Sequence, residues 1–305
     1  MPAKQNPIFV IGSINTDMVA MTKNLPAPGE TVMGGEFMMT AGGKGANQAV
    51  SAARLGGKVT MVGRLGKDIF GDQSIACLKH ESINCDFIGR DPIAASGVAL
   101  ISVDDKGENH IVVAPGANNQ LDQTKVRAAL DSMPDNAIIL LQLEIPLDTV
   151  AHIIDATRGS SRRVILDPAP APVSVLPLNF LNELYLITPN ETEAKKLTGI
   201  EVRDDKSAEV AAKKLLATGV KNVAITMGAK GVLLAQENTI KFIPSPQVKA
   251  IDTTAAGDCF NGALSVGIAS GLSLEEGIKR ACLAASISVT RKGAQDSMPY
   301  IEEID

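Results

Sequence analysis

Short apolar runs alternate with amphipathic segments along most of the chain. The runs typical of buried strands occupy residues 8–12, 59–63, 137–143, 164–167, 184–188 and 223–226. The segments with helical spacing occupy residues 69–80, 150–157, 207–217 and 275–290. Strands that alternate with helices in this way predict an α/β fold, a three-layer sandwich whose mostly parallel central sheet is covered on both faces.

Two pairs of strands interrupt this alternation. Residues 18–40 interleave apolar and polar side chains around a Pro-Ala-Pro-Gly turn, and residues 97–103 and 110–114 flank a polar turn that contains Gly107. We interpret the four strands as a small antiparallel lid, inserted at about 15–40 and 96–114 into a single domain that spans 1–305. An apolar lid face needs a cover, which either a substrate or the same surface of a second subunit would supply.

Composition narrows the class of protein. A hydrophobic content of 45% over 305 residues fits a globular enzyme, and a net charge of -5 provides no general attraction to nucleic acid or acidic membranes. The four cysteines form no CxxC pair and have only three histidines to join in a metal site, so we expect reduced thiols. The sequence contains no apolar run of the ~20 residues that a membrane span needs, which favours a cytoplasmic protein.

The stretch from Ile251 to Ala263 carries the clearest chemistry. Its small residues predict a loop that enters a helix at Ala255, Ala256 and Gly257, where backbone N–H groups have no helical partners and suit an anion. Asp258 follows at once, in a position that should repel anions. A carboxylate there makes sense as a base beside a phosphate, so that base and anion site together form a phosphotransferase centre. The alternative is an ordinary helix start with a capping Asp.

Polar side chains also follow two of the predicted strands. Asn15 and Asp17 come just after the first strand and Glu144 ends the strand 137–143, and open α/β sheets bind ligands at such strand ends. Asn and Asp that bond to their own turn would explain the first pair equally well. The Gly-rich segment 41–48 brings Lys44 and Asn47 to one turn. It lacks the spacing of a phosphate-binding P-loop, and a helix entry with a solvated lysine is the alternative.

Two later segments have simpler explanations beside functional ones. Asn190 with Glu193 three residues later is a helix-capping arrangement, and capping alone accounts for both residues. The turn from Met227 to Gly231 follows a strand, where glycines either admit a nucleotide or only reverse the chain.

Two motifs about 210 residues apart give the chain a resemblance to a known family. Gly42-Gly43-Lys44-Gly45-Ala46-Asn47 and Asp252-Thr253-Thr254-Ala255-Ala256-Gly257-Asp258 resemble the two signatures of the ribokinase-like, phosphofructokinase-B (PfkB) carbohydrate kinases. Segments 12–17, 188–193 and 289–295 also resemble this family, in the same order. The resemblance covers essentially the whole chain.

The resemblance implies an ATP-dependent kinase that phosphorylates the O5 hydroxyl of D-ribose, with Asp258 as base and Ala255, Ala256 and Gly257 as anion hole. The sugar-binding residues that it implies are Asn15, Asp17, Gly43, Lys44, Asn47, Glu144 and Asp258. The ATP contacts that it implies are Asn190, Thr226, Gly228, Lys230, Gly231, Gly257 and Cys282, the last near the adenine, where close relatives often carry Asn.

The resemblance further implies metal ions and an assembly. Glu193 would order magnesium through water. A monovalent cation site of the potassium type would be made, largely through backbone oxygens, by Asp252, Thr254, Ser288, Arg291, Gly293 and Ser297. The lid would pair in a homodimer.

Several alternatives remain open from the sequence. Within the family, the acceptor could be another small sugar such as 2-deoxyribose, or a nucleoside, although an aromatic content of 3% argues against a stacked base. A nucleotide- or sugar-binding protein without catalysis is an alternative of another class, and the presence of Asp258 argues against it. An oxidoreductase would need a GxGxxG fingerprint, which the sequence lacks.

Overall fold

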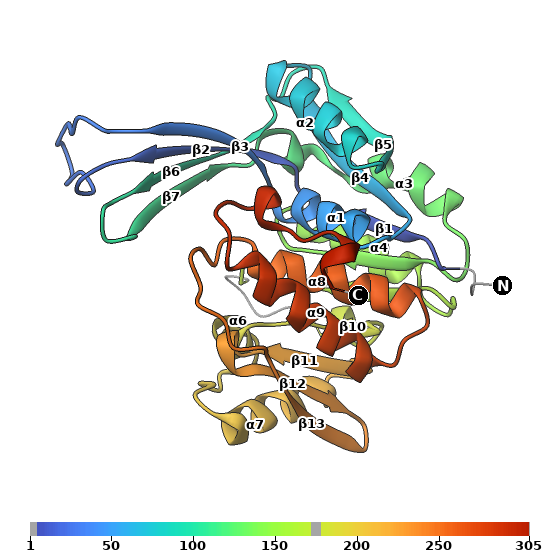
Figure 1. The fold of residues 1–305 in the computed structure, drawn as a ribbon. Helices are drawn as coiled ribbons and strands as arrows, with labels where there is room; N and C mark the ends of the chain where they lie inside the picture. Colours follow the sequence, from blue (N-terminus) through green and yellow to red (C-terminus); the bar gives the residue numbers. More distant parts are fainter. Residues whose placement is uncertain (1–4, 172–177, 305) are drawn as a thin grey trace.

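A nine-stranded sheet forms the centre of the computed structural model, which describes residues 5–171 and 178–304 (Figure 1). Its strands, in spatial order, are β13 (Thr239–Pro244), β12 (Gly231–Gln236), β11 (Asn222–Thr226), β10 (Leu186–Ile187), β9 (Arg163–Leu166), β8 (Ile138–Leu141), β1 (Ile8–Ile11), β4 (Val59–Gly66) and β5 (Asn84–Asp91). The pairs from β11 to β5 are parallel, and the β12–β13 hairpin adds an antiparallel edge.

Helices cover both faces of this sheet. Successive side chains of a buried strand point to opposite faces, so each strand contributes to two hydrophobic cores, one on each side of the sheet. In β1, Ile8 and Val10 pack into one core while Phe9 and Ile11 pack into the other. Helices α1 (Lys44–Arg54), α2 (Ile69–His80), α8 (Ala256–Ala269) and α9 (Leu274–Ser288) supply the first core. Helices α3 (Gln123–Ser132), α4 (Leu147–Ala156), α6 (Glu191–Thr198) and α7 (Asp205–Leu216) supply the second, together with the short α5 (Leu178–Leu181). The predicted three-layer α/β sandwich is confirmed.

A second sheet projects from this body (Figure 1). It contains β2 (Asn15–Met21), β3 (Phe37–Gly42), β6 (Gly97–Val103) and β7 (Asn109–Ala114) in the order β3-β2-β6-β7. The prediction of an antiparallel sheet is wrong for its central pair, since β2 and β6 run parallel. β2 follows β1 and β6 follows β5, and the carboxyl ends of β1 and β5 lie on the same side of the main sheet because these strands are parallel. The two strands of the lid therefore point outward in the same direction.

Most predicted elements occur at the predicted places. The helix expected at residues 69–80 has the bounds of α2, and the helix expected at 207–217 is α7. Two elements were not predicted from the sequence. Helix α3 buries only Val126, Ala129 and Leu130, and β5 is an edge strand in which polar residues are frequent and most side chains are half-buried. The loop expected at 168–177 lies partly outside the described residues.

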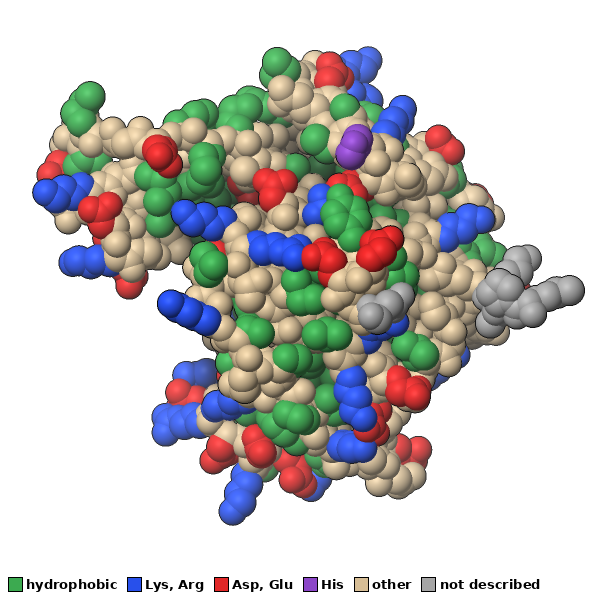
Figure 2. Space-filling view, in the orientation of Figure 1, with side chains coloured by type: hydrophobic (Ala, Val, Ile, Leu, Met, Phe, Trp, Pro, Cys, Tyr) green, Lys and Arg blue, Asp and Glu red, His purple; other side chains and the backbone are tan. Residues whose placement is uncertain are grey.

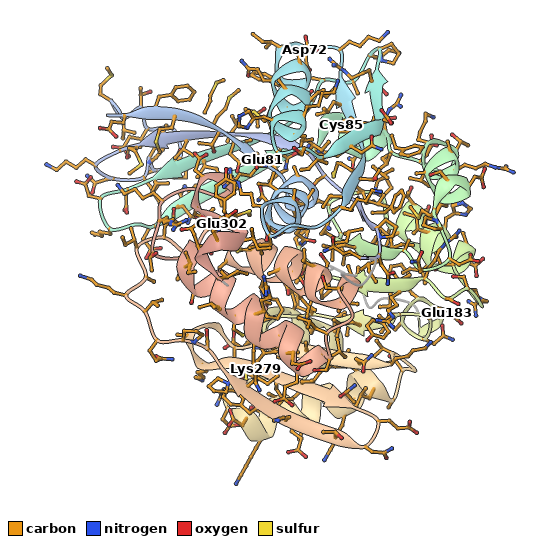
Figure 3. All side chains as sticks on the ribbon, turned by 45° about the vertical axis from the view of Figure 1, so that its right-hand side comes forward. Asp72, Glu81, Cys85, Glu183, Lys279 and Glu302 are labelled. Atoms are coloured by element: carbon orange, nitrogen blue, oxygen red, sulfur yellow. The ribbon has the colours of Figure 1, made fainter. Side chains whose placement is uncertain are left out.

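Helix α9 packs across the β12–β13 hairpin on the front of the molecule (Figure 3). Glu275, at the start of α9, pairs with Lys241 of β13 and with Lys279 one helical turn further on, each at 2.6 Å. In the two described ranges, no helix has both the length and the apolar composition to cross a bilayer.

Candidate functional site

The turn between β1 and β2 places Asn15 in a fixed position. Asn118, from a short 3-10 helix at Gly116–Gln120, donates from Nδ2 to Asn15 Oδ1 at 2.8 Å. The same side chain accepts from the Ile14 N–H at 3.0 Å and donates to the Ile14 carbonyl at 3.2 Å. Asn118 therefore fixes the start of β2 and, with it, the direction of Asn15.

Asp17 lies against the Gly-rich segment that precedes α1. A Cβ on Gly42 would lie 2.3 Å from an Asp17 carboxylate oxygen. Gly43 has a φ of 88°, and a Cβ there would lie 2.6 Å from the backbone nitrogen of Asn15. Only glycine allows the two segments to approach so closely. Burial raises the pKa of Asp17 to about 6, and the negative charges of Glu144 and Asp258 add to the effect.

Glu144, beyond the carboxyl end of β8, is tied to the same place. Its Oε2 accepts from Ser13 Oγ at 2.5 Å and from the Lys44 N–H at 3.2 Å. Burial alone would lower the pKa of Lys44, but Asp258, Asp167 and the other carboxylates nearby raise it above its usual range. Lys44 is therefore a permanent cation among these acidic groups.

Helix α8 begins with an uncapped first turn. Its N-cap residue, Ala255, makes no side-chain cap bond and adopts a left-handed conformation with φ of 56°, which is uncommon for a residue other than glycine. The Ala256 N–H donates to the Thr253 carbonyl at 3.3 Å. Open space surrounds Gly257, where an added Cβ would meet nothing within 4 Å. The helix N-terminus thus faces a cavity and provides a positive end for an anion.

Asp258 points into this cavity from a buried position, with 5% of its surface exposed. Its Oδ2 accepts from Asn47 Nδ2 and its Oδ1 accepts from Gln48 Nε2, each at 3.0 Å. Burial raises the pKa of Asp258, while Lys44 and the amides of Asn47 and Gln48 oppose that rise. A carboxylate with a raised pKa accepts a proton more readily than an ordinary one, which suits Asp258 to act as a base.

Two cavities meet at the start of α8. The larger, of about 420 Å³, has a largely apolar wall, and the smaller, of about 190 Å³, leads to Asp258. The residues that line both are Asn190, Thr226, Thr253, Ala256 and Gly257. Gly228, Gly231 and Cys282 line only the larger cavity. An elongated ligand with an apolar end and a polar end could occupy both.

The predicted cap of α6 is confirmed, and its residues also face the smaller cavity. Asn190 Oδ1 accepts from the Glu193 N–H at 2.9 Å, and Glu193 Oε2 accepts from the Asn190 N–H at 2.8 Å. Asp167, at the carboxyl end of β9, lines the same cavity. Burial raises the pKa of both Glu193 and Asp167, and Lys44 is the nearby cation that opposes this for each.

Glu193 and Asp167 suit magnesium held partly by water and phosphate, rather than a metal ion coordinated by protein side chains alone. Within the described ranges, no group of three or more His, Cys, Asp or Glu side chains could hold a metal. Magnesium commonly keeps several waters and binds one or two carboxylates together with phosphate oxygens. Glu193 and Asp167 provide two such carboxylates beside the start of α8.

The two segments expected to hold a monovalent cation lie side by side. Ile251 N–H donates to the Val289 carbonyl at 2.7 Å, and Asp252 accepts from the N–H groups of Thr254 and Gly293, each at 2.9 Å. Burial alone would raise the pKa of Asp252, but these hydrogen bonds lower it overall. The Ser288 and Ser297 hydroxyls donate to carbonyls of their own turns, at Ala285 and Ala294. The ionised carboxylate of Asp252 therefore joins the two segments.

Two residues named for the nucleotide and cation sites have side chains bonded outside those sites. Lys230 Nζ donates to the Arg203 carbonyl at 3.1 Å, and the Arg291 guanidinium pairs with Glu303. Conversely, the sequence interpretation missed Asp167, although it ends a buried strand just as Glu144 does. It also missed Gln48, whose Nε2 donates to Asp167 Oδ2 at 2.7 Å as well as to Asp258. For Gln48, no local pattern signals the role.

Such an arrangement suits phosphoryl transfer to an alcohol. Asn15, Asp17 and Glu144, whose polar side chains could bind hydroxyls, lie on the lid side of Asp258, and a nucleotide-sized cavity lies on the other side. The Asp258 carboxylate lies between them, beside the positive end of a helix. The class of protein is therefore a kinase that acts on a small polyhydroxy compound.

The chain belongs to the PfkB family of carbohydrate kinases, whose sequence pattern matches residues 5–301. It is 41% identical to a ribokinase of Haemophilus influenzae over 97% of this chain and 96% of that protein. It is 38% identical to a deoxyribokinase of Salmonella typhi over 98% and 97% of the two chains. The structure of Arabidopsis thaliana ribokinase complexed with ribose and ATP superposes with a TM-score of 0.88 at 32% identity, over 99% of this chain and 98% of that one.

Proposed function

We propose that this protein is an ATP-dependent kinase that transfers the γ-phosphoryl group of ATP to the O5 hydroxyl of D-ribose. The observation that carries the proposal is the position of Asp258, a buried carboxylate at the inner end of the two joined cavities and beside the uncapped start of α8. The similarity to ribokinases, one of them complexed with ribose and ATP, supports ribose as acceptor and ATP as donor.

In this mechanism Asp258 takes the proton of the sugar hydroxyl as its oxygen attacks the γ-phosphorus. Asn15, Asp17 and Glu144 hold the other hydroxyls, so that the reacting oxygen is already directed at the phosphate. The side chain of Lys44 and the amides of Ala255 and Gly257 stabilise the negative charge that spreads over the transferred group.

The adenosine part of ATP would occupy the larger cavity, between Cys282 and the turn from Thr226 to Gly231. Magnesium, when bound, neutralises charge on the phosphate oxygens, and Glu193 and Asp167 are the residues that would hold its waters. A monovalent cation of the potassium type would bind at Asp252 and the carbonyls around Gly293, where it would fix the loop that leads into α8.

We also propose that residues 1–305 form a single catalytic domain and that two copies of the chain form a homodimer through the lid. Asp17 shares a lid face with the apolar Met38 and Ile111, as the pairing register places them, and this face would close over the sugar. The opposite face exposes four large apolar side chains, Phe37, Met39, Leu100 and Val112, and Figure 2 shows hydrophobic side chains gathered on the lid. A second copy of the chain would cover them.

A cytoplasmic location agrees with this activity. ATP is abundant there, and all four cysteines are unpaired thiols, as expected in a reducing compartment. Fractionation of the native cells would test this location.

An ADP-release assay tests the proposed reaction. D-ribose, 2-deoxyribose, fructose 6-phosphate and adenosine are each offered with Mg-ATP, with potassium present or replaced by sodium. We expect the highest kcat/KM with D-ribose and a stimulation by potassium. Absence of ADP release with every acceptor would favour a non-catalytic binding protein.

The second candidate acceptor is 2-deoxyribose, because a deoxyribokinase is 38% identical over nearly the whole chain. The two sugars differ only in the 2-hydroxyl group, so the ratio of their kcat/KM values decides between them. A ratio in favour of 2-deoxyribose would replace ribose as the natural acceptor while leaving the kinase mechanism in place.

A further inference from the structure

Four carboxamide side chains form a hydrogen-bonded cluster on the Asp258 carboxylate, two in contact with it and two behind them. Asn47 and Gln48 each donate to one of its oxygens at 3.0 Å. Two glutamines lie behind them: Gln142 Nε2 donates to Gln48 Oε1 at 2.6 Å, and Gln295 Nε2 donates to Asn47 Oδ1 at 3.1 Å. We call these four side chains the amide cage.

The cage joins three separate parts of the chain. Asn47 and Gln48 are neighbours on α1, Gln142 directly follows β8, and Gln295 begins a short 3-10 helix near the C-terminal end. Their exposed fractions are 5%, 0%, 0% and 8%, respectively. Water is therefore largely kept from the hydrogen bonds that hold Asp258.

The outer two glutamines decide which way the inner two amides point. A carboxamide has a donor end and an acceptor end, and a rotation of 180° would direct the carbonyl oxygen of Asn47 or Gln48 at the carboxylate. Because Gln142 and Gln295 donate to those carbonyl oxygens, both NH₂ groups must face Asp258. The second hydrogen of Gln48 is used as well, in its bond to Asp167 at 2.7 Å.

Gln142 makes this contribution at a cost. Its Oε1 is buried without a hydrogen-bond partner, the one such side-chain atom within the described residues. Gly12 makes room for it, since a Cβ there would lie 1.9 Å from that oxygen. A buried oxygen without a partner is unfavourable, and such atoms in folded proteins often mark a functional demand. Methionine, similar in size to glutamine, would remove the cost.

We propose that Gln48, Gln142 and Gln295 are positioning residues that, with Asn47, fix the direction of the Asp258 carboxylate and keep it ionised. The inference rests on the proposed function, in which Asp258 is the base. Gln142 and Gln295 do not contact the Asp258 carboxylate, and each acts through the inner amide to which it donates. Gln48 donates to the carboxylate itself and touches neither the sugar nor the phosphate in the proposed mechanism.

The charged groups around Asp258 make this support important. Asp17, Glu144, Asp167 and Glu193 carry the same charge, and Lys44 is the cation that opposes their effect. Burial already raises the pKa of Asp258, and the two inner amides oppose that rise. Loss of their correct orientation would raise this pKa further, so the base would be protonated up to a higher pH.

The test compares Gln142→Met and Gln295→Met with the wild-type enzyme. The readouts are the single-turnover rate of sugar phosphorylation from pH 5 to pH 9, the KM of each substrate, and the thermal midpoint. Gln236→Met is the matched control, because Gln236 Nε2 donates to Asn222 Oδ1 at 2.8 Å in a similar amide pair on β12 and β11, away from the site.

For Gln142→Met we expect a rate about ten- to a hundredfold lower at pH 7, an acid limb moved to higher pH, unchanged KM values, and a thermal midpoint equal to or above that of the wild type. Gln295→Met should show the same rate loss and pH shift, and it keeps the test valid should Gln142→Met not fold. The control should leave rate and pH profile unchanged.

A pH profile identical to that of the control in both folded variants would overturn the inference, whatever the thermal midpoint. Asp258→Asn, measured in parallel, separates the two proposals. If Asp258→Asn remains active, the proposed base is wrong; if it is inactive while the glutamine variants behave like the control, only the amide cage is wrong.

Discussion

Replacement of Asp17 by Asn should make the ligand-free protein more stable at neutral pH. The folded protein holds the Asp17 carboxylate in a buried place beside Glu144 and Asp258, which raises its pKa from 3.8 to about 6. A shift of roughly two units corresponds to about 3 kcal/mol of unfavourable free energy for the ionised side chain in the folded state. Asparagine keeps the shape and removes the charge.

The sign of the effect depends on pH. Because the folded state binds the proton more tightly than the unfolded state, Asp17 reduces stability as the pH rises from about 4 to about 6, and the reduction is complete above that range. Asp17→Asn should therefore raise the free energy of unfolding by about 1–3 kcal/mol at pH 7 and by little at pH 4.

The assay is thermal and urea unfolding of both proteins at pH 4 and pH 7, without sugar or nucleotide. Asp122→Asn is a control in which the stability should change in the opposite direction. Hydrogen bonds from Thr124 and Lys125 hold the pKa of Asp122 at about 2, so loss of that charge should reduce stability at pH 7. Equal stability of wild type and Asp17→Asn at pH 7, or an equal gain at both pH values, would refute the reasoning. Sugar affinity should fall about ten- to a hundredfold in the same variant, through loss of charge-assisted hydrogen bonds to hydroxyls.

Three further predictions concern the lid and the metal. Gly42→Ala should raise the KM for ribose at least tenfold, because its Cβ would force the Asp17 carboxylate from its place, and steady-state kinetics measure this. Glu193→Gln should raise the magnesium concentration needed for half-maximal activity about tenfold with a smaller change in sugar KM, as a magnesium titration would reveal. Leu100→Asp should convert the proposed lid dimer to a monomer in sedimentation velocity, since a charge would then lie in the apolar lid face; an unchanged dimer would place the contact elsewhere.

The main sheet could be predicted from the sequence because its strands are buried on both faces. The four residues of β1 and of β8 are all buried, so each appears as an uninterrupted apolar run. The parallel pairing of β2 with β6 could not be predicted in this way. It depends on the direction in which each strand leaves the main sheet, and periodicity carries no information about direction.

In the candidate site too, some residues could be predicted from local sequence and others could not. Asp258, Lys44 and Asn190 lie in short motifs that show their chemistry locally. Gln48 and Gln142 lie 94 residues apart and only meet because α1 packs beside the end of β8. Their hydrogen bonds result from tertiary structure, and a glutamine in a helix gives no sign of such a partner.

The most direct test of the account is the single-turnover rate of Asp258→Asn, measured with saturating Mg-ATP and ribose, together with the affinity for each ligand. We predict that both ligands bind with little change while phosphoryl transfer slows by roughly two to four powers of ten, because the sugar hydroxyl has lost its proton acceptor. A transfer rate near that of the wild-type enzyme would contradict the account.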